Sequence, residues 1–204
     1  VFGSDSDNIH LMHDDGNIVW TYATGDKVQS APSIINTGTS KLICAGSKDN
    51  SMHCIDDNGD LVFSVETNGN VFTSVSAVSI SNGIGIFFGS VDGYIYGVNQ
   101  TGNPLPGWTK DTGSNVVGSI AFSDLDNDNI PEVVSTNEDG YILAYHLDGS
   151  EITYFPILGD FSYSSSPQIL DFDGDGDLEL FAGTTLGLEV FDIKTQGSNL
   201  GYWN

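Results

Sequence analysis

The 204-residue chain carries 28 acidic and only five basic side chains, which gives a formal charge of −23 at pH 7. All five basic residues are lysines, 22 of the acids are Asp, and Arg does not occur. This balance argues against binding to nucleic acid or to an anionic membrane surface, and it excludes any site that needs an Arg clamp on phosphate. With 39% hydrophobic and 11% aromatic residues the chain can still build a core, so we expect a folded protein.

Three further features limit the class of protein. No run approaches the roughly 20 apolar residues that a membrane helix needs, so we expect no membrane insertion. The chain begins Val-Phe-Gly-Ser, without Met or a signal-like segment, which indicates a processed chain or a fragment. Cys44 and Cys54 are the only cysteines, too few for a disulfide framework.

Two sequence patterns recur in phase along the chain. In the first, a turn Gly recurs at intervals of 43, 43, 47 and 48 residues, and an aromatic follows it by four to six residues. The glycines are Gly16, Gly59, Gly102, Gly149 and Gly197, and the aromatics are Trp20, Phe63, Trp108, Phe155 and Trp203. The second pattern occurs as Phe2-Gly3-Ser4, Ala45-Gly46-Ser47 and Phe88-Gly89-Ser90, with a weaker copy at Ala182-Gly183-Thr184. We interpret them as one internal repeat.

Each repeat contains short apolar or alternating segments separated by turns. The first strands of successive units are expected at residues 30–36, 74–80, 119–124 and 166–171. In the third unit we expect further strands at 85–89, at 94–99 and around Trp108, and then one at 116–122. The turns at 91–93 and 100–102 end in Gly, which supplies positive φ. Because no window combines a 3.6-residue period with helix caps, we expect essentially no helix.

Four strands in a repeat of about 40–50 residues are typical of a β-propeller blade. A β-sandwich also has short strands and regular turns, but it would not repeat its own sequence in register. We therefore predict an all-β fold, a β-propeller built of four-stranded antiparallel blades at 1–29, 30–72, 73–116, 117–162 and 163–204. The chain would open in a second strand and end in a fourth, with about four and a half blades of a ring of about seven or eight.

Two acidic loops stand between the first and second expected strands of the last two blades. Both have Asp at positions 1, 3 and 5 and Glu at position 9. These residues are Asp124, Asp126, Asp128 and Glu132 in the first loop, and Asp171, Asp173, Asp175 and Glu179 in the second. At position 7, Ile130 and Asp177 would each contribute a backbone carbonyl. Alternating oxygens on a tight loop suit Ca²⁺, which takes six to eight such ligands.

A solvated turn is the simpler interpretation of an Asp-rich loop. Two observations favour calcium. The pattern occurs twice at equivalent places. The repeats without it have a short turn there instead, at residues 36–38 or 81–83, and these are the repeats of 43 residues, so the extra residues of the longer repeats form the acidic loop. Gly176 at position 6 eases the sharp turn, and Asn129 tolerates a left-handed backbone. An EF-hand is excluded because position 12 is not Glu, and nothing resembles a phosphate-bridged magnesium site. We predict two Ca²⁺ sites with a structural role.

Several segments resemble known propeller families. Residues 92–108 (DGYIYGVNQTGNPLPGW) and 14–22 (DDGNIVWTY) resemble the repeats of quinoprotein-type (PQQ-like) propellers. Residues 124–136 (DLDNDNIPEVVST) and 171–184 (DFDGDGDLELFAGT) resemble the calcium loops of FG-GAP/VCBS repeats, found in integrin-type propellers and many secreted bacterial proteins. The resemblance covers nearly the whole chain, and the calcium loops are its specific part. It implies an extracellular binding or scaffolding ring, which in some members is the body of a polysaccharide lyase.

The histidines occupy positions that other residue types fill in other repeats. His10 and His53 occupy equivalent positions, as do His13 and His146, and Tyr, Asp or Asn replaces them in other units. Such interchange indicates strand and turn positions rather than zinc ligands. Cys44 and Cys54 flank one turn, so they either form a disulfide in an oxidising compartment or remain two buried thiols.

We therefore expect a secreted or cell-surface, calcium-binding propeller that acts as a non-catalytic interaction, adhesion or structural module. Its partner would be a protein or a carbohydrate on a loop face, and a homo-oligomer or larger assembly is compatible with this role. The alternative is the propeller body of a carbohydrate-active enzyme, such as a polysaccharide lyase, which would gather Lys, Tyr, His or Arg on one face. A quinoprotein is less favoured. The quinoenzymes of that family typically offer adjacent cysteines and a basic partner, and this chain has neither.

Overall fold

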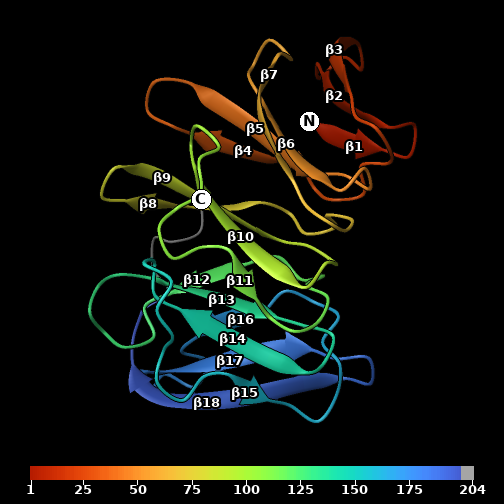
Figure 1. Ribbon diagram of the computed structural model, residues 1–204. Coiled ribbons are helices and arrows are strands. Elements are labelled where there is room, and N and C mark those ends of the chain that lie inside the picture. Colours follow the sequence, from red (N-terminus) through yellow and green to blue (C-terminus); the bar gives the residue numbers. More distant parts are fainter. Residues whose placement is uncertain (199–204) are drawn as a thin grey trace.

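The computed structural model describes residues 1–198, which form strands and turns only (Figure 1). The expectation of an all-β chain without helix is confirmed over these residues, where no helix long and apolar enough to cross a membrane is found. Five antiparallel sheets follow one another in chain order. The predicted fourth strand at the chain end and the aromatic Trp203 lie outside the described residues.

Strands that are consecutive in sequence are neighbours in every sheet. The first sheet contains β1 (Phe2–Ser4), β2 (Asn8–Met12) and β3 (Ile18–Ala23). The second contains β4 (Ser33–Asn36), β5 (Lys41–Gly46), β6 (Ser51–Ile55) and β7 (Leu61–Glu66). The third contains β8 (Ser76–Ile80), β9 (Gly83–Gly89), β10 (Tyr94–Asn99) and β11 (Lys110–Asp111). The fourth contains β12 (Ala121–Ser123), β13 (Glu132–Thr136), β14 (Tyr141–Tyr145) and β15 (Ile157–Leu158), and the fifth contains β16 (Gln168–Leu170), β17 (Asp177–Gly183) and β18 (Leu188–Gln196).

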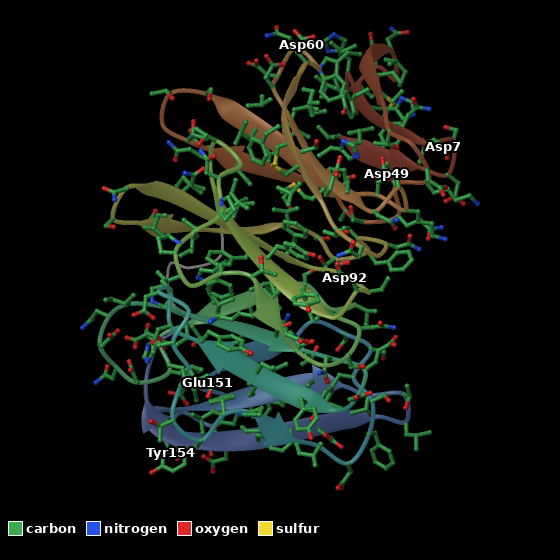
Figure 2. The ribbon with its side chains drawn as sticks, viewed as in Figure 1. Asp7, Asp49, Asp60, Asp92, Glu151 and Tyr154 are labelled. Carbon is green, nitrogen blue, oxygen red and sulfur yellow. A yellow bond between two sulfur atoms is a disulfide. The ribbon has the colours of Figure 1, made fainter. Side chains whose placement is uncertain are left out.

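This up-and-down order gives each sheet two distinct ends. In a four-stranded sheet the connections between strands one and two and between strands three and four lie at the same end, which we call the acidic-loop end. The connection between strands two and three lies at the opposite end. In Figure 2, Asp49 and Asp92 mark that opposite end, while Glu151 and Tyr154 belong to the acidic-loop end.

The core is divided into four apolar clusters, one between each pair of consecutive sheets. The cluster between the third and fourth sheets contains Phe87, Trp108 and Phe122, whose rings pack edge to face. Every sheet therefore buries both faces or one face against its chain neighbours, as layered β folds require.

The Gly-Ser pattern marks a close approach between each sheet and the segment that leads from it to the next sheet. After each sheet the connecting segment places a Val against the Gly, and the Val amide N–H donates to the carbonyl oxygen of the adjacent Ser. The donors are Val28, Val71 and Val116, and the acceptors are Ser4, Ser47 and Ser90, at 3.0, 3.0 and 3.1 Å. A Cβ added at Gly3 would lie 2.5 Å from Val28 Cγ1, and Gly46 and Gly89 are equally crowded. Only Gly fits there.

Serine side chains join the first strands of consecutive sheets. The Ser33 hydroxyl donates to the Val75 carbonyl at 2.6 Å, and the Ser76 hydroxyl donates to the Ile120 carbonyl at 2.7 Å. Residues of β4, β8 and β12 line a cavity of about 890 Å³. The serines that open β4 and β8 thus satisfy backbone groups that would otherwise stay unpaired at a sheet edge.

Two expected strands differ from the structure. Around Trp108 the chain forms a turn closed by its amide N–H and the Leu105 carbonyl at 3.1 Å, so that β11 shrinks to two residues. Pro104 and Pro106 explain this, because proline cannot donate to a strand ladder. Over 116–122 only the last two residues belong to a strand, since the preceding ones cross from the third sheet to the fourth.

Candidate metal centre

Both acidic loops occupy the same place, the connection between the first and second strands of the fourth and fifth sheets. In the first loop the structure brings Asp124, Asp126 and Asp128 together, with one carboxylate oxygen of each within 4.8 Å of the others. These are the residues predicted for positions 1, 3 and 5. The position-7 residue Ile130 lies on the exposed part of the loop.

Asp124 organises the first loop from inside. Its side chain is only 1% exposed, and its two carboxylate oxygens accept the amide N–H groups of Asp128 and Asn129, both at 3.0 Å. Asp128 in turn accepts the Ile130 amide N–H at 2.7 Å. The chain therefore wraps around its own carboxylates, which places several oxygens on the concave side of one turn.

Two positions in each loop have a left-handed backbone. Position 4 is Asn127 with φ 65° or Gly174 with φ 82°, and position 6 is Asn129 with φ 68° or Gly176 with φ 95°. Asn and Gly are the residues that enter this region at low cost. The prediction covered position 6, whereas the equal demand at position 4 emerged only from the structure.

The position-9 glutamates close both loops with the same bond. Glu132 accepts the Leu125 amide N–H at 2.6 Å, and Glu179 accepts the Phe172 amide N–H at 2.6 Å. Glu132 is fully buried. Burial raises the pKa of Glu132 to about 8; the Leu125 hydrogen bond opposes this rise, and the charges of the three loop aspartates add to it.

The second loop gathers a different set of carboxylates. Asp173, Asp175, Asp177 and Glu179 lie within 4.8 Å of one another. Asp177 was expected to supply only its backbone carbonyl, and its carboxylate also belongs to this group. Asp171 does not; its carboxylate accepts the Gly174 amide N–H at 2.7 Å instead.

His146 was missed as a neighbour of the first loop. It lies in the turn after β14, and its Nδ1 is 3.3 Å from a carboxylate oxygen of Glu132. Val133 pairs with Tyr145, so His146 and Glu132 are opposite one step further along the same strand pair. In the fifth sheet the residue opposite Glu179 is Asp192. Only the strand register reveals these pairs, because the partners are more than ten residues apart in sequence.

The hydrogen-bond partners of a second histidine, His53, come from two consecutive sheets. His53 Nε2 is 2.9 Å from an Asp49 carboxylate oxygen, and His53 Nδ1 is 3.1 Å from the Tyr22 hydroxyl. In the third sheet Tyr96 takes the place of His53 and donates its hydroxyl to Asp92 at 2.8 Å. Both aspartates also accept an amide N–H from the preceding sheet, at 2.8 Å in each case. The arrangement therefore braces consecutive sheets.

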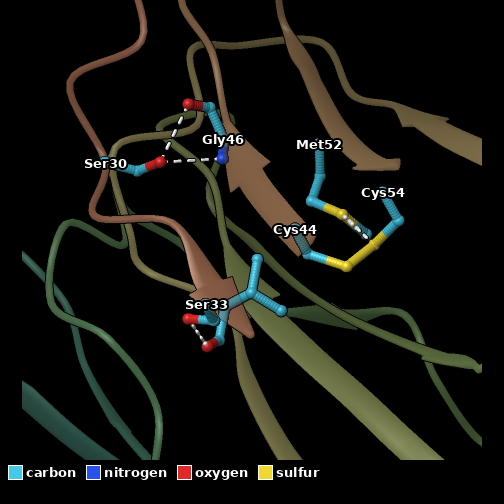
Figure 3. Close-up of a disulfide and its surroundings, with 7 residues drawn as sticks. Ser30, Ser33, Cys44, Gly46, Met52 and Cys54 are labelled. Carbon is cyan, nitrogen blue, oxygen red and sulfur yellow. Dashed lines mark hydrogen bonds between the residues drawn. A yellow bond between two sulfur atoms is a disulfide. The ribbon is translucent and has the colours of Figure 1, made fainter. Parts of the chain in front are cut away.

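The two cysteines form a disulfide (Figure 3). Cys44 on β5 and Cys54 on β6 are paired directly across the two strands, with 4.1 Å between their Cα atoms. Both are fully buried in the cluster between the second and third sheets, beside Met52. Of the two alternatives that the sequence left open, the structure selects the disulfide.

Comparison with known families identifies the part of the chain that holds both loops. Residues 124–182 match the family model described as FG-GAP-like repeat. This segment of the chain thus resembles an FG-GAP-like repeat. Comparison with curated proteins gave no match.

Solved structures share the fold of the chain. BBS1N in complex with ARL6DN, soaked with mercury, is 14% identical with a TM-score of 0.64, over 99% of this chain and 61% of that one. The same complex soaked with lead gives 14% identity and a TM-score of 0.63, over 99% and 60%. BamB from Moraxella catarrhalis is 18% identical with a TM-score of 0.64, over 93% and 53%. The chain thus spans about three fifths or less of these proteins.

Proposed function

We propose that this chain is a calcium-binding β-propeller segment that acts as a non-catalytic interaction, adhesion or structural module outside the cell. The observation that carries the proposal is the pair of FG-GAP-like loops, each of which gathers at least three carboxylates within 4.8 Å at the same place in its sheet.

The donors of both loops suit calcium. They are carboxylate and backbone oxygens, hard ligands that can adopt the flexible arrangement of six to eight contacts that Ca²⁺ takes. Asp124, Asp126, Asp128 and Glu132 would hold the ion of the first loop, with the Ile130 carbonyl. Asp173, Asp175 and Glu179 would hold the second, with Asp177, while Asp171 would have to turn toward the ion. The ion would supply positive charge that neutralises the clustered carboxylates.

The first loop has a clear electrostatic need for such charge. Its four carboxylates include the buried Asp124 and Glu132, and among the described side chains no lysine forms an ion pair with them. Asp126 and Asp128 are exposed, and the negative charges of the three aspartates oppose a charge on the buried Glu132. A bound divalent cation converts that repulsion into a clamp on the β12–β13 connection.

The role as a module rests on the fold and on the disulfide. BBS1N, a relative in structure, was crystallised in complex with ARL6DN, so a propeller of this shape holds a protein partner there. We propose the same kind of use here, with a protein or carbohydrate bound at a loop-bearing end of the sheets. The buried disulfide supports an extracellular location, because such bonds persist in oxidising compartments.

Calcium binding is tested by thermal unfolding and calorimetric titration of the chelator-treated chain. Added Ca²⁺ should raise the melting temperature and saturate two sites, and EDTA should reverse the effect. Asp128→Asn and Asp175→Asn should each lose one site. Asp60→Asn, in an exposed turn outside both loops, should retain both. A melting curve that calcium and EDTA leave unchanged would contradict the calcium sites, and depolymerisation of a polysaccharide by the purified chain would contradict the non-catalytic role.

A further inference from the structure

The first acidic loop differs from the second because a histidine nitrogen, that of His146, lies beside its carboxylates. Asp126, Glu132 and His146 form a group in which each offers one ligand atom within 4.8 Å of the other two. One of these atoms is an imidazole nitrogen. Asp126 also belongs to the group with Asp124 and Asp128, so it lies between two sets of possible ligands.

One distance within this group, that between His146 and Glu132, matches the ligand spacing around a small ion. Two ligand atoms bound at 2.0–2.1 Å to one tetrahedral ion lie about 3.3 Å apart. The distance from His146 Nδ1 to the Glu132 carboxylate oxygen is 3.3 Å. Glu132 is held in place by burial and by the Leu125 amide N–H, so that one of its oxygens stays directed at His146.

A cavity of about 300 Å³ borders the group. Asp126 and His146 form part of its wall, together with Thr153 and the apolar side chains of Ile152 and Ile157. Because two of the three protein ligands border this space, a fourth coordination position would be open toward it for water or for an atom of another molecule, as in an exchangeable metal site rather than a closed structural one.

The strand register supplies an internal comparison. The residue opposite the position-9 glutamate is His146 in the fourth sheet and Asp192 in the fifth. The second loop therefore offers oxygen donors alone, which suit calcium. An imidazole nitrogen is a poor calcium ligand and a good one for Zn²⁺ and its neighbours.

We propose that Asp126, Glu132 and His146 form a site for a transition metal ion of the Zn²⁺ class. This inference rests on the proposed function, because the calcium ion proposed for the first loop would also use Asp126 and Glu132. The two ions therefore compete at the first loop, while the second loop keeps its preference for calcium. The competing account is that His146 and Glu132 share only a hydrogen bond.

The test uses the full chain freed of metal and then titrated with Co²⁺, followed by absorption, and with Zn²⁺, followed by calorimetry. The wild type should bind one Co²⁺ with a visible ligand-field band that Zn²⁺ removes. His146→Asp should weaken Zn²⁺ binding at least tenfold and abolish the band. It should fold, because Asp56 holds the equivalent turn position in the second sheet and accepts the Asn58 and Asp60 amide N–H groups there.

His13→Asp is the matched control. His13 and His146 begin the same kind of turn, in which their amide N–H groups bond the carbonyls of Asn17 and Ser150 at 2.9 Å. Among the described residues His13 belongs to no group of metal-binding side chains, so this variant should bind Co²⁺ like the wild type.

Calcium titration separates the outcomes. Saturating Zn²⁺ should reduce the number of Ca²⁺ bound from two to one, and His146→Asp should restore the second. If calcium binds but Co²⁺ gives no band, or gives the same band with His146→Asp, the transition metal site is overturned and the calcium sites stand. If neither metal binds, both proposals fall.

Discussion

The indole N–H of Trp20, on β3 of the first sheet, donates to the backbone carbonyl of Asp57 in the second sheet at 3.0 Å. Trp108 repeats this bond with Leu147 of the fourth sheet, at 2.9 Å. The turn glycine stands next to the acceptor: a Cβ added at Gly59 would lie 2.9 Å from the Trp20 ring. The aromatic and the turn Gly of the repeat therefore meet across consecutive sheets, which explains why they stay in phase along the sequence.

Replacing Trp108 with Phe should lower the free energy of unfolding by about 1–3 kcal/mol, because the Leu147 carbonyl loses its donor and the buried ring loses volume. Trp20→Phe should cost less, since Trp20 is more exposed. Phe63 already occupies the equivalent position beside Gly102, so Phe fits the backbone there. Urea unfolding measures both variants, and equal midpoints for Trp108→Phe and wild type would show that the indole bond contributes nothing.

Gly46→Ala should destabilise the chain by about 1–3 kcal/mol, because the new methyl group meets Val71 in the segment that leads from the second sheet to the third. Gly187→Ala is the control, since a Cβ there meets no atom within 4 Å. Thermal unfolding compares the two. Similar melting temperatures for the two variants would mean that the Gly-Ser pattern does not mark a tight contact.

Removing the disulfide with Cys44→Ala and Cys54→Ala together should cost about 3 kcal/mol, the chain-entropy estimate for the ten-residue separation that it closes. The loss should appear in urea unfolding of the oxidised wild type against the double variant. Alkylation of the denatured, unreduced chain checks the bond itself: modified cysteines there would show that the thiols are free.

Tyr163 gives a prediction for alkaline pH. Its side chain is 1% exposed and its hydroxyl donates to Glu189 at 2.6 Å. Burial raises the pKa of Tyr163, and the hydrogen bond and charge of Glu189 add to the rise. A tyrosine whose pKa is higher in the folded chain contributes stability that is complete below its unfolded pKa of about 10 and is lost as the pH rises above it.

Tyr163→Phe should therefore be less stable than the wild type at neutral pH by about 1–3 kcal/mol, and the difference should shrink above pH of about 10. Urea midpoints measured on both sides of that pH test this. Tyr154→Phe serves as the control, because Tyr154 is 92% exposed. A constant difference between Tyr163→Phe and wild type at all pH values would contradict the assignment.

The sequence predicted the parts of the fold that depend on local chemistry. Turn glycines such as Gly16 and Gly59 have the positive φ that their turns require, and the acidic loops lie between first and second strands as expected. The prediction of a strand around Trp108 was wrong, because it followed the apolar pattern and gave too little weight to Pro104 and Pro106. The blade limits drawn from the repeat, the number of blades in a ring and the calcium ions themselves stay predictions.

Contacts between side chains on different strands could not be predicted from the local sequence. The pairing of Cys44 with Cys54 depends on the register of β5 and β6, and a shift of one residue would place the two side chains on opposite faces. The approach of His146 to Glu132 depends in the same way on β13 and β14. Interchange of residue types among repeats indicated a turn position for His146, which is correct, but it carried no information on what lies across the sheet.

The succession of apolar clusters has a thermodynamic consequence. Each cluster lies between two consecutive sheets, and the Val-to-Ser bonds hold the segment that leads to the next sheet against the sheet it leaves. Stability is then close to a sum over single sheets and single interfaces, as in a one-dimensional array. A weak interface such as that created by Gly46→Ala would divide the array into two cooperative units, which would melt at separate temperatures and exchange their amide hydrogens at separate rates.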